Sequence, residues 1–152
     1  MSEAWSSIRP RRNTPIRRLE AKADLYIQVL SRVVWKGHCC WCKKYVRTAR
    51  QGGGHHLFTK NFFRFRHSII NVPYMCLSCH NKVHSGGDPE FKMYIRQHWY
   101  YLYEWYEFHR MPKGMRKTQT LLKERITKLE EQLRKHGVNI KYIKEGDYNG
   151  FN

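Results

Sequence analysis

Apolar residues recur at steps of three and four between Arg18 and Lys36. They are Leu19, Ala23, Tyr26, Val29, Leu30 and Val33. This spacing places all of them on one face of a helix, and Gly37 is a plausible stop. The segment therefore predicts an amphipathic helix over residues 18–36.

The chain between Tyr45 and Tyr74 has short apolar runs without helical spacing. Two of them, Leu57-Phe58 and Phe62-Phe63, flank a polar stretch. This pattern predicts two short strands or extended segments joined by a loop. The polar segment 79–85 then predicts a helix of about two turns, which would place His80 and His84 on one face.

The second half of the chain predicts further helices. Asp88 is expected as an N-cap, followed by Pro89 and Glu90 in the first turn. The aromatic-rich segment 99–108 either continues this helix or forms a second one, and residues 111–114 break it.

A last helix is predicted over 118–136, with Gly137 as its C-cap. It carries an apolar stripe of Leu122, Ile126, Leu129 and Leu133. We expect this stripe to pack on the preceding aromatic helix, with dimerisation as the alternative, so the protein is a monomer or a homodimer. Residues 138–152 are expected to form a partly ordered tail.

The net charge points to a polyanionic partner. The 152 residues include 29 Lys+Arg and 12 Asp+Glu, a formal charge of +17, which favours nucleic acid binding. Residues 1–17 are expected to be a flexible basic arm. The candidate phosphate contacts are Arg9, Arg11, Arg12, Arg17, Arg18, Lys60, Arg64, Arg66 and Lys82. Whether the aromatic segment contacts DNA or fills the core stays open.

Two cysteine pairs predict a structural zinc site. Cys39, Cys42, Cys76 and Cys79 form two C-x-x-C pairs, the donor set and spacing of a tetrahedral zinc. Cys40 is assigned as a bystander. No apolar run is long enough to cross a bilayer, and the N-terminus has no secretory pattern. We therefore expect an intracellular, reducing compartment, without membrane association.

The histidines suggest a second site. The chain places His55-His56 after a triple glycine, then Asn71, then His80 and His84. This spacing resembles the HNH (ββα-metal) nuclease motif in the form seen in colicin nucleases, including cysteine pairs before the first histidine and around the last ones. The other histidines fall outside the spacing and are expected on the surface or in the core: His38, His67, His98, His109 and His136.

The resemblance covers residues 39–84 and implies a division of labour. His56 would be the general base, and His55, facing the opposite way in an extended segment, would join His80 and His84 in holding one divalent ion, Mg²⁺, Mn²⁺, Ni²⁺ or Zn²⁺. Asn71 would hydrogen-bond within the ββα loop and keep His56 oriented.

The predicted fold class is therefore α+β. A small ββα-metal core, stapled by a zinc on four cysteines, is preceded by one helix and followed by two or three. Residues 18–87 would form the first helix and the nuclease core, and residues 88–137 a helical extension. The overall layout is also similar to the phage lambda NinG (Rap) recombination nucleases, although Cys79 is followed by His80 where Asn is expected.

The expected function is a divalent-metal-dependent DNA endonuclease. The second resemblance implies branched recombination intermediates as substrates, duplex DNA being the other possibility, and a phage gene acting in the cytoplasm of a bacterial host. Two alternatives stay open, a site-specific nicking or homing endonuclease and a noncatalytic zinc module that binds nucleic acid.

Overall fold

The computed structural model describes residues 13–110 and 113–143. The first element is the predicted long helix, α1 (Pro15–Val34). It begins three residues earlier than predicted, because the Thr14 side chain caps it by accepting a hydrogen bond from the Arg17 backbone N–H and proline is tolerated in a first helical turn. Arg17 therefore belongs to the helix and not to the arm. Gly37, with φ 71°, follows the helix end as expected.

A two-stranded antiparallel sheet follows, made of β1 (Gly52–Gly54) and β2 (Tyr74–Cys76), with Gly53 opposite Met75. Strand β1 consists of glycines. Neighbouring side chains leave no room for a Cβ atom at Gly52, where it would lie 2.6 Å from the Tyr74 hydroxyl. The extended segments expected at 57–58 and 62–63 are wrong, since both lie in an irregular loop. Phe58 there packs against Tyr106 and Trp105 and pairs with no strand.

Short helices lead out of the sheet. Helix α2 (Leu77–Lys82) passes through a wide turn, Val83–Gly87, into α3 (Asp88–His98). Asp88 is the first residue of α3 and not its N-cap, and its carboxylate pairs with Lys92 at 2.6 Å. A separate helix, α4 (Tyr100–Phe108), follows a break at Trp99, whose indole N–H donates to the Cys40 carbonyl at 2.7 Å.

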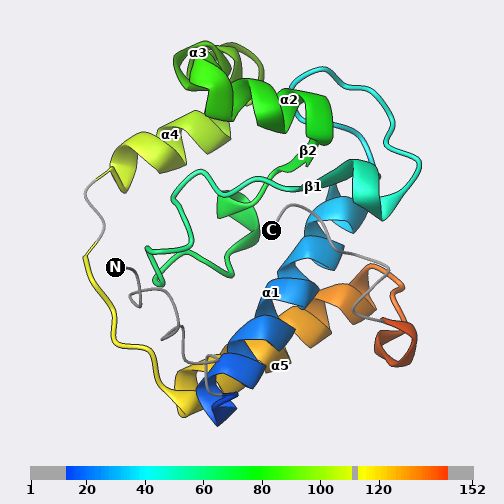
Figure 1. Ribbon diagram of the computed structural model, residues 1–152, viewed down its shortest axis with the longest axis vertical. Coiled ribbons are helices and arrows are strands. Elements are labelled where there is room, and N and C mark those ends of the chain that lie inside the picture. The colour runs from blue at the N-terminus through cyan, green and yellow to red at the C-terminus, as the bar shows by residue number, and fades with distance from the viewer. Residues whose placement is uncertain (1–12, 111–112, 144–152) are drawn as a thin grey trace, which may run out of the picture.

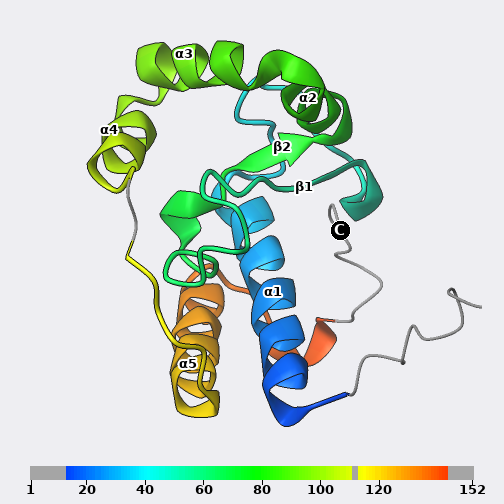
Figure 2. The ribbon, with the colours of Figure 1, turned by 60° about the vertical axis from the view of Figure 1, so that its left-hand side comes forward.

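The last long helix, α5 (Gln119–Lys135), lies beside α1, and the two run in the same general direction (Figures 1 and 2). The expectation that its stripe packs on the aromatic helix is therefore wrong. The apolar face of α1 receives the stripe instead, while α4 packs against α3, the cysteine segment and the loop after β1.

Buried apolar residues form two clusters. The helix-pair cluster joins α1, α5 and Val72: Ala23, Tyr26, Ile27, Val29, Leu30, Val72, Ile126, Leu129 and Leu133. The knuckle cluster joins the cysteine segment to the sheet and to α3 and α4: Cys39, Cys40, Trp41, Leu57, Met75, Val83, Phe91, Ile95 and Leu102. The sheet and the loop after it lie between the helix pair α1 and α5 and the short helices α2, α3 and α4 (Figure 2).

The described part of the tail is ordered against the helix pair. Val138, Ile140 and Ile143 pack on the helix-pair cluster, and Ile140–Tyr142 forms a single 3₁₀ turn. The rest of the predicted tail, 144–152, lies outside the described residues, as does most of the predicted arm. In the two described ranges, no helix has the length and apolar character that crossing a membrane requires.

Candidate active site

The four predicted cysteine ligands come together. Cys39 and Cys42 lie in a tight turn after α1, Cys76 ends β2, and Cys79 lies in the first turn of α2. Their four Sγ atoms lie within 4.8 Å of one another. Cys40 is fully buried and lies outside this group, so the cluster fits a tetrahedral zinc.

The electrostatics of the thiols favour a cation at their centre. A hydrogen bond from Cys40 lowers the pKa of Cys39 to about 4. Burial and the negative charge on Cys39 both raise the pKa of Cys79. Cys39 and Cys79 therefore resist ionising together unless a positive charge lies between them, which is what a bound zinc supplies.

Three histidines form a second cluster, as the spacing predicted. His55 immediately follows β1, and His80 and His84 come from α2 and the turn after it. Their ring nitrogens lie within 4.8 Å of one another, with 3.2 Å between the Nε2 atoms of His80 and His84. Phe91 packs edge-on against the buried His55 ring, and the three ring nitrogens lie close enough together to hold one metal ion.

Burial favours the neutral form of His55 and His80. Burial, reinforced by the nearby His80 and His84, lowers the pKa of His55 to about 3. Burial and His84 lower the pKa of His80 to about 4. A neutral imidazole has a free lone pair, so His55 and His80 offer nitrogen ligands at neutral pH without first losing a proton.

His56 points to a different partner. Its Nε2 lies 3.0 Å from the carbonyl oxygen of Arg66, and the two rings of the histidine pair thus face different groups, as an extended segment requires. A carbonyl oxygen can only accept a hydrogen bond, so Nε2 carries the proton and Nδ1 has the free lone pair. Burial lowers the pKa of His56 to about 4.

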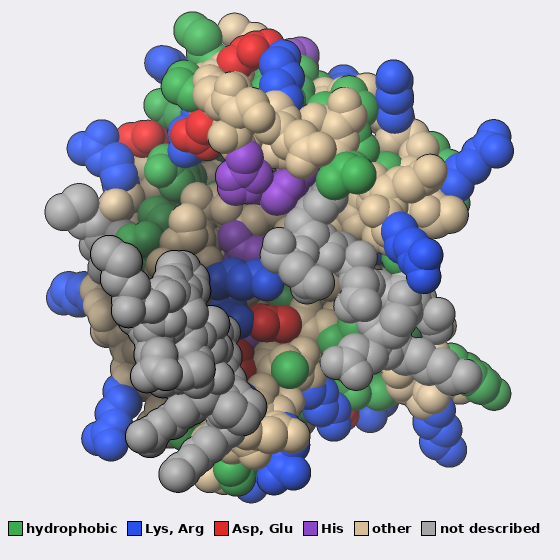
Figure 3. Space-filling model, viewed as in Figure 1, with side chains coloured by type: hydrophobic (Ala, Val, Ile, Leu, Met, Phe, Trp, Pro, Cys, Tyr) green, Lys and Arg blue, Asp and Glu red, His purple; other side chains and the backbone are tan. Residues whose placement is uncertain are grey.

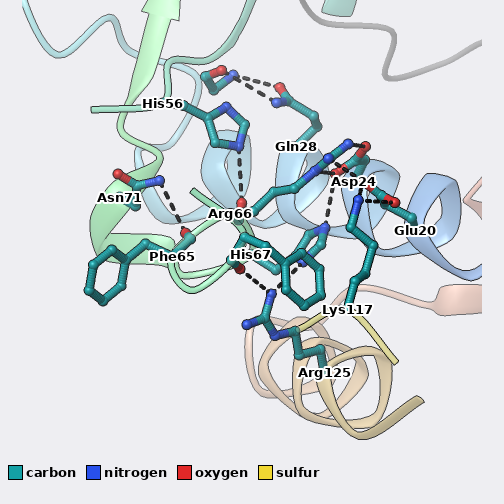
Figure 4. A network of polar contacts seen from close by, with 12 residues as sticks. Glu20, Asp24, Gln28, His56, Phe65, Arg66, His67, Asn71, Lys117 and Arg125 are labelled. Carbon is teal, nitrogen blue, oxygen red and sulfur yellow. Dashed lines mark hydrogen bonds and ion pairs between the residues drawn. The ribbon is translucent and has the colours of Figure 1, made fainter. Parts of the chain in front are cut away.

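Asn71 fixes the loop that supplies this carbonyl. Its side chain is fully buried, accepts from the Phe58 N–H at 2.7 Å, and donates to the carbonyls of Phe58 and Phe65 at 3.1 Å. The Asn71 amide therefore holds the loop at Phe65, one residue before Arg66, whose carbonyl oxygen binds His56 (Figure 4). Asn71 therefore makes the predicted loop contacts and reaches His56 through the backbone.

An ion-pair network supports the same loop from the side of α1 (Figure 4). The Arg66 guanidinium pairs with Glu20 and, at 2.6 Å, with Asp24, while His67 Nε2 donates to Asp24 at 2.9 Å. Burial raises the pKa of Asp24, but hydrogen bonds from His67 and Arg66 outweigh it and hold the pKa well below its usual value. Asp24 is therefore a permanent anion at neutral pH.

The network changes the interpretation of several predicted phosphate contacts. The Arg66 side chain is only 15% exposed and is neutralised by carboxylates, so it is structural. Lys82 pairs with Glu90 at 2.9 Å and lies over the Trp41 ring. Arg9, Arg11 and Arg12 lie outside the described residues, whereas Arg17, Arg18 and Arg64 are exposed.

Lys60 lies close enough to His56 to lower its pKa by charge repulsion. On the face viewed in Figure 3, histidine side chains gather at the centre, with Lys and Arg side chains directly below them. Asp and Glu side chains adjoin these Lys and Arg side chains (Figure 3), so Lys60 is the cation that acts directly on His56 without a paired carboxylate among the described residues.

Sequence reasoning missed the polar face of α1. Glu20, Asp24 and Gln28 follow one another at steps of four, one helical turn apart, and Ser31 continues the row. Gln28 binds the backbone of Gly54, and the Ser31 hydroxyl donates to the Val72 carbonyl at 2.6 Å. The regular spacing of these polar residues beside the apolar stripe was the signal that could have found them.

No protein-family model, curated protein or solved structure matches this chain.

Proposed function

We propose that the protein is a divalent-metal-dependent DNA endonuclease of the HNH (ββα-metal) type. The observation that carries the proposal is the pairing of two arrangements at the end of β1. His55 meets His80 and His84 in a cluster of three nitrogen donors, and the adjacent His56 is held by a backbone carbonyl on the other side.

His56 would act as the general base. Because its Nε2 proton is engaged by the Arg66 carbonyl, Nδ1 is left to take a proton from the attacking water. A fixed tautomer keeps that lone pair available and correctly aimed, which is the role of a partner to a catalytic imidazole. Asn71, Asp24 and Arg66 would serve as positioning residues, since they hold the loop and touch no reacting atom.

His55, His80 and His84 would hold the divalent ion. When bound, such an ion neutralises charge that builds on the phosphate and on the leaving oxygen. Three nitrogen donors would leave coordination positions open for phosphate and water, and Lys60 adds positive charge beside His56. The four-cysteine cluster would hold a structural zinc that fixes the ends of β2 and α2.

The substrate is proposed to be DNA, either duplex or a branched recombination intermediate. The net charge of +17 supports a nucleic acid substrate, with binding that weakens steeply as salt rises. Cleavage of a four-way junction compared with the matching linear duplex tests the branched-DNA preference. A faster rate on the junction supports it, and equal rates remove it.

The decisive experiment is His56→Ala. Removing the base should lower the cleavage rate by about 10²–10⁴-fold while DNA binding stays the same. His136→Ala, at the exposed end of α5, is the matched control and should cut normally. Cleavage by purified His56→Ala at the rate of the unmodified protein would show that another group activates the water.

The pH profile gives a second test. Since burial lowers the pKa of His56 to about 4, the base stays unprotonated throughout the neutral range. The cleavage rate should therefore show no protonation step near pH 6.5, the usual pKa of histidine, and its acid limb should lie below about pH 5. A midpoint near 6.5 would contradict this assignment of the base.

The metal content separates the nuclease from a noncatalytic zinc module. The nuclease should bind one tight zinc and one exchangeable ion per chain, and His84→Ala should lose only the exchangeable ion. Metal analysis after dialysis measures both. A single metal that is unchanged by His84→Ala would favour the noncatalytic module.

A further inference from the structure

Two half-buried arginines near the loop after β1 differ in how their charge is balanced. Arg66 pairs with the carboxylates of Glu20 and Asp24. Arg125, on α5, donates to the carbonyls of Phe63 and Arg64, to His67 Nδ1 and to Met115 Sδ, all of which are neutral acceptors. Arg125 is therefore held in place with its charge unbalanced (Figure 4).

The acceptor at His67 is neutral for a structural reason. Its Nε2 donates to Asp24 at 2.9 Å, and its Nδ1 lies 3.1 Å from Arg125. An imidazole with both nitrogens engaged in this way donates from one and accepts at the other. The negative charge of Asp24 thus compensates the positive charge of Arg66. His67 offers Arg125 only a neutral hydrogen-bond acceptor.

Arg125 lines a concavity of about 330 Å³ between α5 and the loop. Arg64 and Lys128 contribute two further cations, and His67, Ser68 and Gln132 add polar groups. The lining contains no aspartate or glutamate, and among the described residues no carboxylate lies within 4.0 Å of the charged nitrogens of Arg64, Arg125 or Lys128. The concavity is therefore positively charged throughout.

The cation at its inner side is rigid. The Phe63 ring lies 4.1 Å from the Arg125 guanidinium carbon, and the two terminal nitrogens are anchored to the loop backbone at 2.6 Å and 3.1 Å. Burial and repulsion from Arg64 and Arg66 lower the pKa of Arg125. An anion bound here would relieve the repulsion between the cations. Little side-chain entropy would be lost on binding, because the Arg125 side chain is already fixed.

We propose that this concavity, formed by Arg64, Arg125 and Lys128 with His67, Ser68 and Gln132, binds a backbone phosphate of nucleic acid. The identity of the anion rests on the proposed nuclease function. The concavity has room for a phosphate with its sugar, and the Arg64 guanidinium and Lys128 ammonium groups are usual phosphate partners. Both terminal nitrogens of Arg125 already donate to two neutral acceptors each, so Arg125 would attract the phosphate by its charge. The same loop carries the Arg66 carbonyl that holds His56, so a phosphate bound here would anchor the nucleic acid to the segment that positions the base.

The test removes the charges of Arg64 and Lys128. It leaves Arg125 unchanged, because Arg125 also supports the loop. Arg64→Gln/Lys128→Gln is made in the His56→Ala background, so that DNA stays intact, and binding of a labelled duplex is measured by fluorescence anisotropy from about 50 to about 200 mM salt. The double variant should bind about tenfold more weakly, and the slope of log affinity against log salt should fall by about 1.

The control is a substitution of the same kind on the same helix, which removes one positive charge outside the concavity. Lys123 is exposed on α5 and does not line the concavity, so Lys123→Gln should leave the salt slope unchanged. Equal slopes for the double variant and for Lys123→Gln, with both proteins melting like the parent, would overturn the proposal. If the double variant has a lower melting temperature than the parent, Lys128→Gln alone is used in its place. A reduced salt slope then supports the proposal, and a slope equal to that of Lys123→Gln overturns it.

A titration with inorganic phosphate distinguishes a nucleic acid subsite from a site for a free anion. Inorganic phosphate that binds the parent, is lost in the double variant and leaves duplex affinity unchanged would replace the DNA subsite with a free-anion site. The proposed function is tested separately, because the slopes are measured without cleavage. An unmodified protein that cuts no DNA removes the nuclease, and the slopes still decide the subsite.

Discussion

The helix-pair cluster is formed mainly by side chains of two long helices, whereas the knuckle cluster is formed by short segments that surround four cysteines. In the first, α1 and α5 bury Ile27, Leu30, Leu129 and other aliphatic residues against each other. In the second, a three-residue strand and a six-residue helix supply two of the four thiols. Short elements like these bury little apolar area of their own.

The difference teaches where each half obtains its stability. Long amphipathic helices gain most of theirs from apolar packing. A region built from turns and three-residue strands depends on a crosslink, and a bound zinc is the crosslink that the cysteines allow. We therefore expect the two halves to respond differently to metal loss, to cavity formation and to pH.

The largest effect is expected from Cys76→Ser. Loss of one thiolate should remove a structural zinc contribution on the order of 10 kcal/mol, and the knuckle cluster should unfold. Metal analysis should show the tight zinc lost, and hydrogen exchange should show rapid exchange in β2, α2 and α3 with protection kept in α1 and α5. Cys40→Ala should retain the metal, since Cys40 lies outside the ligand group. Unchanged metal content and melting in Cys76→Ser would exclude a structural zinc.

Leu129→Ala should act on the other half. Leu129 is 2% exposed within the helix-pair cluster, so the cavity should cost about 3 kcal/mol in the free energy of unfolding while metal content stays the same. Urea denaturation measures this cost. Thr127→Ala, at an exposed position on the same helix, should change stability by less than about 0.5 kcal/mol. A loss of zinc in Leu129→Ala would mean that the two clusters fold as one unit.

Asp24→Asn tests the network between the halves and should cost about 2 kcal/mol, because two cationic or donating partners lose their anion. The pKa of Asp24 is held well below its usual value of 3.8. The carboxylate therefore stabilises the fold fully above about pH 4 and loses this effect as pH falls below it. The stability difference between Asp24→Asn and the unmodified protein should be constant from pH 5 to 8 and shrink in more acid solution.

Urea denaturation at each pH measures that difference, with Glu124→Gln on the exposed face of α5 as the control. Equal stabilities at neutral pH would mean that the ion pairs only offset their own desolvation.

The smallest effect is expected at a helix cap. The Thr118 side chain accepts a hydrogen bond from the Leu121 N–H at 3.2 Å, and Thr118→Ala should cost about 1 kcal/mol. Thr48 precedes a 3₁₀ turn without making a side-chain cap, so Thr48→Ala should have almost no effect. Thermal melts of both variants compare them. Equal melting temperatures would show that the start of α5 contributes little to the helix pair.

The parts of the fold that sequence could predict are those that depend on nearby residues. The apolar spacing in 18–36 and in 118–136 is local, and both helices form as predicted apart from their terminal residues. The cysteine and histidine groups follow from spacing in part, since each C-x-x-C turn and the His80–His84 pair bring their ligands together locally. The meeting of these pairs with each other and with His55 depends on the pairing of β1 with β2.

The parts that sequence could not predict depend on partners. A stripe such as that of α5 shows which face is buried, but it does not identify the helix that buries it. The strand Gly52–Gly54 has the residue type least typical of strands, and only its contacts with Tyr74 and Val46 explain it. Arg66 and Arg125 each add one positive charge to the composition, yet carboxylates on α1 neutralise only Arg66 of the two.

Gln28 has a consequence for how this protein behaves beside other copies of itself. Its side-chain amide accepts from the Gly54 N–H at 2.6 Å and donates to the Gly54 carbonyl at 3.3 Å, as a neighbouring strand would. A sheet of two strands has two open edges, each able to recruit a strand from another chain. The glutamine occupies the edge beside the histidine pair, which protects a glycine-rich strand from edge-to-edge aggregation.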